Sequence, residues 1–187
     1  MDCTSCTYDK KCRKTEACKA TSFSKSEVVR KYADEQEIVQ AAAELVDFGR
    51  AGTLSRLQEI IAFSKKMKYQ RVGLAYCYGM ENQVQQIAGI MRKNGLNVRA
   101  VSCTVGGIPQ NEVNPESAFC TVSCNPIGQA MQLNHEKADL VVMIGLCLGH
   151  DILFQREIEA DCTTLVVKDR VFNHAPLNVL DDKERLN

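Results

Sequence analysis

The chain has 187 residues, of which 45% are hydrophobic and 25% are charged, and these values are ordinary for a folded globular protein. Its 23 Lys and Arg balance its 23 Asp and Glu, so we expect neither nucleic acid nor an anionic membrane surface as a partner. No apolar run approaches the roughly 20 residues that span a bilayer, and the first residues, MDCTSCTYDKK, are unlike a signal peptide, which together predict a cytoplasmic protein.

The ten cysteines are the unusual feature of the composition. In a reducing compartment, cysteines in such numbers serve more often as metal or cluster ligands, or as catalytic groups, than as disulfides. They form two sets, because four lie within the first 18 residues and six are spread over residues 77–162. We therefore expect two separate sites.

The first set lies in residues 1–22, which lack apolar periodicity and cannot bury a core of their own. The spacing C-x2-C-x5-C-x5-C places four soft ligands there: Cys3, Cys6, Cys12 and Cys18. Four thiolates can hold one Zn²⁺ or one [4Fe-4S] cluster, and binding would supply the folding free energy of the segment. The spacing predicts a small metal-binding knob, with zinc and iron-sulfur as alternatives; the competing interpretation is a set of free thiols on a disordered tail.

Residues 23–187 are predicted to form an α/β domain. Apolar residues at helical spacing predict packing helices over residues 24–68, after which strand-helix units follow over residues 71–187. The expected strands are 72–76, 98–102, 140–144 and 163–168; the expected helices are 81–94, 126–134 and one that begins at 150; and residues 104–123 form a long loop. This alternation predicts a three-layer, Rossmann-like fold with a parallel sheet of about four strands in the order 2-1-3-4.

The stretch ADLVVMIGLCLGHD, residues 138–151, places one cysteine at a defined point of that sheet. Its continuous apolar half is typical of a strand buried on both faces. Gly145 and Gly149 flank Cys147 and allow a sharp turn, after which a helix begins at His150. Cys147 is therefore expected at the carboxyl end of a central strand, where ligands bind in open α/β sheets.

The same reasoning applies to three more cysteines of the second set. Cys77 and Cys103 directly follow the first two strands, and Cys124 precedes a helix whose unpaired N–H groups favour a thiolate. A single buried cysteine is more often a core residue, but four at one edge predict a cofactor site formed by Cys77, Cys103, Cys124 and Cys147. We expect a [4Fe-4S] cluster rather than zinc, because all four ligands are thiols and no histidine is well placed.

The two remaining cysteines of the second set, Cys120 and Cys162, are expected to have different roles. Cys120 is an alternative to Cys103 as a ligand, since it lies in the loop close to Cys124. Cys162 precedes the expected fourth strand, at the opposite edge of the sheet, and is assigned to packing.

Candidate catalytic residues are Cys124 as a nucleophile, His150 as a proton donor near neutral pH, and Asp151. His150 and Asp151 also suit a purely structural role as polar residues in the first turn of a helix. The residues at 168–170, Lys-Asp-Arg, could bind an anion at the same edge or form an internal Asp-Arg ion pair.

Several blocks of the chain resemble a prokaryotic family described as metal-binding, domain of unknown function 1847. They are the amino-terminal cysteine segment, CNPIGQA at 124–130, GLCLGHD at 145–151 and TTLVVKDRV at 163–171. The resemblance implies a cysteine-rich metalloprotein and implies no particular reaction. The architecture is also similar to that of desulfidases that hold a [4Fe-4S] cluster with three cysteines and accept sulfur at the open iron, an analogy at the level of fold.

The sequence thus predicts an iron-sulfur protein, possessing a second, cysteine-lined site for redox or sulfur-transfer chemistry with a small-molecule substrate or a redox partner. The alternative is a non-catalytic zinc- or metal-binding module with a structural, storage or sensing role. A third hypothesis is a redox sensor whose metal-free thiols pair reversibly.

Overall fold

The computed structural model describes residues 1–182 and 185 of the chain. Its contacts divide the chain into two units, Met1–Arg50 and Ala51–Asn187. The first unit contains the short 3-10 helix η1 (Lys11–Lys14) and the helices α1 (Lys25–Tyr32) and α2 (Gln36–Val46). The Ser24 side chain accepts a hydrogen bond from the Glu27 N–H and caps α1. The assignment of residues 1–22 to a separate metal-binding unit stays a prediction.

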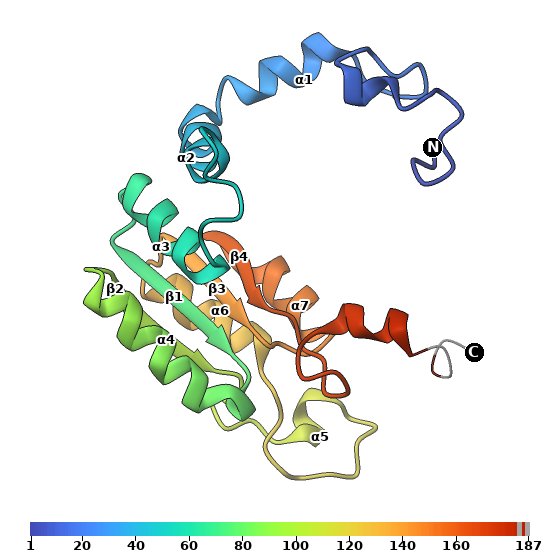
Figure 1. The fold of residues 1–187 in the computed structure, drawn as a ribbon. Coiled ribbons are helices and arrows are strands. Elements are labelled where there is room, and N and C mark those ends of the chain that lie inside the picture. Colours follow the sequence, from blue (N-terminus) through green and yellow to red (C-terminus); the bar gives the residue numbers. More distant parts are fainter. Residues whose placement is uncertain (183–184, 186–187) are drawn as a thin grey trace. The chain divides into compact units, whose positions relative to one another are not determined.

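The second unit contains a four-stranded parallel sheet in the order β2-β1-β3-β4 (Figure 1), which confirms the predicted topology. The strands are β1 (Arg71–Tyr76), β2 (Asn97–Ser102), β3 (Leu140–Ile144) and β4 (Asp161–Val166). Tyr76 pairs in register with Ser102 on one side and with Ile144 on the other. The three strands β2, β1 and β3 therefore end level with one another, at one edge of the sheet.

Helices cover both faces of the sheet, so the unit has the predicted three layers (Figure 1). The remaining elements are α3 (Arg56–Lys66), η2 (Tyr78–Met80), α4 (Glu81–Lys93), α5 (Gln110–Val113), α6 (Pro126–His135), α7 (His150–Glu157) and η3 (Pro176–Asp181). Helices α3 and α4 pack on one face and α6 and α7 on the other, each group with its own buried hydrophobic cluster.

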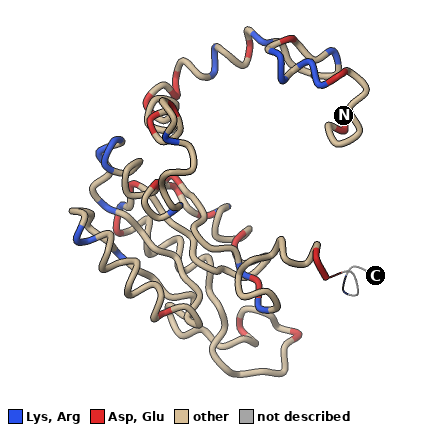
Figure 2. The backbone as a smooth tube through the Cα atoms, in the orientation of Figure 1, with Lys and Arg blue, Asp and Glu red and all other residues tan. Residues whose placement is uncertain are grey.

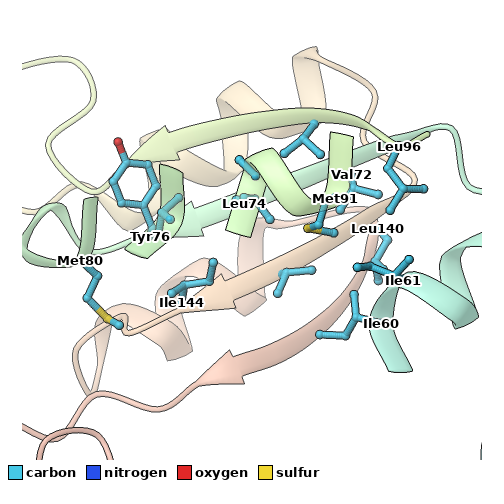
Figure 3. Close-up of a cluster of buried hydrophobic side chains, with 14 residues drawn as sticks. Ile60, Ile61, Val72, Leu74, Tyr76, Met80, Met91, Leu96, Leu140 and Ile144 are labelled. Atoms are coloured by element: carbon cyan, nitrogen blue, oxygen red, sulfur yellow. The ribbon is translucent and has the colours of Figure 1, made fainter. Parts of the chain in front are cut away.

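Alternate residues of the strands supply the two clusters. Figure 3 shows Val72 and Leu74 of β1 directed toward Met91 of α4, in the cluster that α3 completes. Their neighbours on the other face pack on Leu133 of α6 and Phe154 of α7, both fully buried. Because both faces are covered, every residue of β3 is buried, which explains its continuous apolar sequence.

Strand β4 differs from the expectation. It spans Asp161–Val166 instead of 163–168, so Cys162 lies inside the strand, paired with Val141, and not before it. Backbone pairing with β3 does not depend on side-chain polarity, so the ladder includes residues that apolar patterning left out. Cys162 is exposed on this edge strand, and its assignment to packing is wrong.

The long loop over residues 104–123 has more structure than expected. It contains α5, and Pro109 and Val122 form an antiparallel bridge across it. The Ser123 hydroxyl also donates to Gln110 Oε1 at 2.7 Å. These contacts fold the loop back on itself beside the carboxyl edge of the sheet.

Charged residues of both signs are interspersed along the backbone of both units (Figure 2). Within residues 1–182 and 185, none of the helices combines the length and the apolar character that crossing a membrane requires.

Candidate functional site

Four cysteines from the second set line one pocket in the second unit. They are Cys77, Cys103, Cys124 and Cys147, and the pocket also includes Pro126, Gln129, Leu146 and His150. The sequence predicted this convergence, since each cysteine follows a strand or precedes α6 at the same edge. Cys120 is exposed and lies outside the pocket lining, so Cys103 is the residue that joins the other three.

Backbone hydrogen bonds hold two of these cysteines where the strands end, and one of the two also holds the residue after Cys124. The Cys77 N–H donates to the Ile144 carbonyl at 3.1 Å, and the Cys103 N–H donates to the Tyr76 carbonyl at 2.8 Å. The Asn125 N–H in turn donates to the Cys103 carbonyl at 2.6 Å. The sheet ladder therefore continues one residue beyond the strands, and the site rests on rigid backbone.

The turn that carries Cys147 depends on its two glycines. Gly145 and Gly149 have φ angles of 64° and 87°, a region that favours glycine. The Cys147 carbonyl accepts hydrogen bonds from the N–H groups of His150 and Asp151 at 2.9 and 3.0 Å, which starts α7. This geometry confirms the predicted turn between β3 and the next helix.

Nitrogen donors contact three of the four sulfurs. Lys168 Nζ lies 3.2 Å from Cys77 Sγ, and a terminal guanidinium nitrogen of Arg170 lies 3.2 Å from Cys147 Sγ. The Tyr78 N–H donates to Cys103 Sγ at 3.4 Å. Cationic and backbone donors are the groups that can stabilise a thiolate, whereas burial acts against the thiolate form at Cys103.

The segment 168–170 corrects one of the sequence alternatives. Arg170 contacts Cys147, whereas the Asp169 carboxylate accepts hydrogen bonds from the N–H groups of Val171 and Phe172. An internal Asp-Arg ion pair is therefore the wrong interpretation of these residues. Sequence patterning placed the two cations at the correct edge but gave no signal that each would contact a cysteine.

Cys103 and Cys124 form the closest pair of sulfurs, with a Sγ–Sγ distance of 3.6 Å. The pKa of the Cys103 thiol is raised to about 12, chiefly by burial and also by the adjacent Cys124, against the lowering effect of the Tyr78 N–H. Cys124 is only partly buried and directly precedes the N-cap of α6, Asn125, whose Oδ1 accepts from the Gly128 N–H. The two thiols thus differ in solvent access.

Gln129 places an unsatisfied acceptor beside the thiols. Its Nε2 donates to the carbonyls of Tyr76 and Val101 at 3.1 and 2.8 Å, and these two acceptors fix the orientation of the amide. In the described part of the chain its buried Oε1 has no hydrogen-bond partner. Because such a group costs about 1–3 kcal/mol, it marks a place that a hydrogen-bond donor would satisfy.

His150 and Asp151 begin the same helix but occupy different surroundings. His150 lines the pocket, at the edge where the sequence made it a candidate proton donor. A histidine is therefore present beside the four thiols, contrary to the expectation, used to prefer iron-sulfur over zinc, that none is well placed. The Asp151 carboxylate accepts hydrogen bonds from the N–H groups of Gly149 and Ile152, which is the structural role considered for it. Catalytic roles for Cys124, His150 and Asp151 stay predictions.

The size of the pocket limits what can bind in it. The empty space between its lining atoms is about 200 Å³ including open solvent at the mouth, and the lining side chains leave no room for a molecule the size of water. Thiols and an imidazole are ligands that suit zinc and iron-sulfur centres. An ion or a compact inorganic cluster therefore enters only if the lining side chains move apart, and it is the donor set that suits a metal centre.

The sulfur positions do not form a preorganised site for a single ion. Tetrahedral zinc with bonds of about 2.3 Å places its sulfurs about 3.8 Å apart. Cys103 and Cys124 approach this separation, at 3.6 Å. Among the described residues, however, no three Cys, His, Asp or Glu side chains are grouped closely enough to hold a metal ion.

The first set of cysteines lies in the first unit. Cys3, Cys6, Cys12 and Cys18 line a common concavity, together with Tyr8 and Lys10 among others. Hydrogen bonds from the backbone N–H groups of Tyr8 and Lys10 to the sulfur lower the pKa of Cys6. Such N–H to sulfur contacts favour a thiolate, the form in which cysteine binds metal.

Comparison with known proteins identifies the family. A family model described as "Protein of unknown function (DUF1847)" matches residues 14–165. The chain belongs to this family. The matched region contains the whole second set of cysteines and, from the first set, Cys18.

One relative is "Uncharacterized protein MJ0455" from Methanocaldococcus jannaschii, 44% identical over 125 residues. The match covers 64% of this chain and 63% of the relative, so the chain spans less than two thirds of that protein. No solved structure matches the chain. Neither the family description nor the name of the relative states a ligand or a reaction, and metal binding stays a prediction.

Proposed function

We propose that the pocket at the carboxyl edge is a thiolate centre that holds an iron-sulfur cluster, of the [4Fe-4S] type, for redox or sulfur-transfer chemistry. The observation that carries the proposal is the convergence of four cysteines from distant parts of the chain, two of them in contact with Lys168 and Arg170. Four thiolates and a cluster carry net negative charge, and two cations at 3.2 Å from sulfur atoms would offset part of it.

The chemistry of the lining, rather than its size or spacing, supports a cluster. Among residues 1–182 and 185, four cysteines and no carboxylate line the pocket, and thiolates are the ligands of iron-sulfur clusters. The described side chains are not grouped closely enough to hold a single ion as they stand. A cube of four irons takes one ligand at each corner, so the Cys103 and Cys124 sulfurs, 3.6 Å apart, would have to separate for both to bind it.

The chain's own residues have separate roles in this proposal. Lys168 and Arg170 stabilise thiolates, and the unpaired Gln129 Oε1 accepts a hydrogen bond from a bound group. His150 lines the pocket and is the candidate proton donor there. If three cysteines bind the cluster, one iron is open to a small molecule.

We further propose that Cys3, Cys6, Cys12 and Cys18 hold a second metal centre. Their common concavity and the N–H donors that lower the pKa of Cys6 support it. The centre would be an iron-sulfur cluster that exchanges electrons with a redox partner, or a structural zinc. Cytoplasmic localisation belongs to the same proposal, since such thiols stay reduced there.

The second candidate function is a non-catalytic zinc-binding module. The distance of 3.6 Å between the Cys103 and Cys124 sulfurs is close to one edge of a zinc tetrahedron. His150 in the pocket lining adds a nitrogen ligand that zinc accepts readily.

Purification without oxygen distinguishes the two functions. Brown protein with charge-transfer absorption and matching amounts of iron and sulfide supports the cluster. Colourless protein with stoichiometric zinc would overturn it in favour of the module. Cys77→Ser and Cys147→Ser should each reduce the iron content, whereas Cys162→Ser, in β4 and outside both sites, should leave it unchanged.

A further inference from the structure

We propose that Cys103 and Cys124 form a reversible disulfide when the pocket holds no metal, which makes them a dithiol pair that a small disulfide oxidises. Their sulfurs lie 3.6 Å apart, at the end of β2 and at the start of α6. The inference goes beyond the proposed metal centre, because it concerns the metal-free protein and stands on this geometry alone.

The backbone keeps the two cysteines close. The Asn125 N–H donates to the Cys103 carbonyl at 2.6 Å, so the chain directly after Cys124 is fixed to Cys103 itself. A disulfide needs sulfurs about 2.05 Å apart, and rotation about the side-chain bonds can close a gap of about 1.5 Å. The bond can therefore form without separating the elements that carry the cysteines.

The surroundings of the pocket select this pair from the four thiols. Cys77 and Cys147 each contact a cationic side chain, Lys168 and Arg170, at 3.2 Å. Forming a disulfide with either sulfur would give up that contact. Cys103 and Cys124 contact each other, and the donor on the Cys103 sulfur is the neutral Tyr78 N–H at 3.4 Å rather than a cation. Cys120 is exposed and outside the pocket.

Solvent access sets the order of the two steps. The partly buried Cys124 sulfur attacks one sulfur of the oxidant, such as glutathione disulfide; a mixed disulfide forms and one glutathione leaves with the proton from Cys124. The Cys103 sulfur, in a residue that is only 3% exposed, then attacks the Cys124 sulfur and releases the second glutathione with its own proton. The two cysteines lose two electrons, and the oxidant gains them.

A disulfide between Cys103 and Cys124 would change the ligand set of the pocket. It would remove two of the four pocket sulfurs as metal ligands, since only thiolates bind metal. Oxidation of this pair would therefore block loading of the pocket, and reduction would restore it.

Peptide mapping tests the pair. The full-length, metal-free, reduced protein is equilibrated with glutathione disulfide without oxygen, free thiols are alkylated, and the chain is cleaved after glutamate. Cleavage at Glu112 and Glu116 separates Cys103 from Cys124, and a Cys120→Ser background leaves one cysteine on the second peptide. We expect a Cys103–Cys124 cross-link that dithiothreitol reverses, with Cys77 and Cys147 alkylated. A different pairing, or alkylation of both Cys103 and Cys124, would overturn the inference.

Two further variants keep the test decisive if one variant protein fails to fold. Cys103→Ser should accumulate a stable mixed disulfide between glutathione and Cys124, because the second thiol is missing. Cys162→Ser should behave as the parent protein.

Iron and sulfide loading is measured separately on both redox forms: loss of loading in the oxidised form alone supports the inference, and loading of both forms contradicts it. If neither form loads, the metal proposal fails while the cross-link still decides the inference.

Discussion

The guanidinium of Arg170 lies 3.2 Å from the sulfur of Cys147, across 23 residues of chain. The contact joins the segment after β4 to the turn after β3. Lys168, from the same segment, reaches the Cys77 sulfur after β1 at the same distance. One short segment thus supplies a cation to each of two sulfurs of the pocket.

Removing either cation should weaken metal binding by the pocket. We expect Lys168→Met or Arg170→Gln to reduce metal affinity about 10–100-fold, as is usual for residues that contact metal ligands without binding the metal. Competition with a chelator, followed by iron absorption, measures the effect. Lys93→Met, at the end of α4, is the matched control and should leave affinity unchanged. Equal affinity in all variants would show that the cations do not act on the site.

The two sets of cysteines should behave as independent centres. Cys6→Ser is expected to remove one centre and leave the other, since Cys6 lines the concavity of the first unit and the pocket lies in the second. Metal and sulfide analysis of protein purified without oxygen provides the measurement. Loss of both centres, or of neither, would contradict the division into two sites.

The pKa of Cys103 predicts a loss of stability at high pH. Burial raises that pKa to about 12, so the folded protein keeps the thiol protonated, whereas the unfolded chain releases the proton near its ordinary pKa of about 8.5. The stabilising contribution is therefore complete below about pH 8.5 and is lost progressively as the pH rises toward 12.

Denaturant unfolding of the metal-free protein at about pH 8 and about pH 10.5 tests this prediction. The free energy of unfolding should fall more steeply with pH in the parent protein than in Cys103→Ala. Other groups that titrate in this range are common to both proteins, so the difference isolates Cys103. Parallel pH profiles would refute the assignment.

Two glycine substitutions should have opposite effects. A Cβ at Gly73 in β1 would lie 2.8 Å from Leu133 Cδ2 and 3.0 Å from Val141 Cγ2, so Gly73→Ala should cost about 1–3 kcal/mol through overpacking. A Cβ at Gly89 in α4 would meet nothing within 4 Å, and alanine is the better helix former by about 1 kcal/mol. Thermal or urea unfolding should show Gly73→Ala less stable, and Gly89→Ala no less stable, than the parent.

Gln129→Met should lower the free energy of unfolding by about 1–3 kcal/mol. The change removes the two hydrogen bonds that the Gln129 amide donates to the ends of β1 and β2. Gln86→Met, at an exposed position of α4, is the control for the substitution itself and should stay within about 0.5 kcal/mol of the parent. An unchanged stability of Gln129→Met would mean that the amide does not support the site.

Much of the fold, and the convergence of the second set of cysteines, followed from the sequence alone. The apolar run of β3, the glycines around Cys147 and the position of a cysteine after each of the first three strands are local patterns. They determine geometry because parallel strands with right-handed crossovers all end at the same edge of the sheet. The order β2-β1-β3-β4 then brings Cys77, Cys103 and Cys147 together without any knowledge of side-chain positions.

Only the tertiary structure decided which partners each sulfur has. The contacts of Lys168 and Arg170, the place of His150 in the pocket and the unpaired Oε1 of Gln129 depend on how separate segments fold against one another. The start of β4 likewise depends on its pairing with β3 and not on its own side chains. Sequence periodicity indicates which face of an element is buried. The contacts described here depend instead on how side chains orient toward residues far away in the sequence, as Lys168 does toward Cys77. A single sequence carries no signal for such contacts.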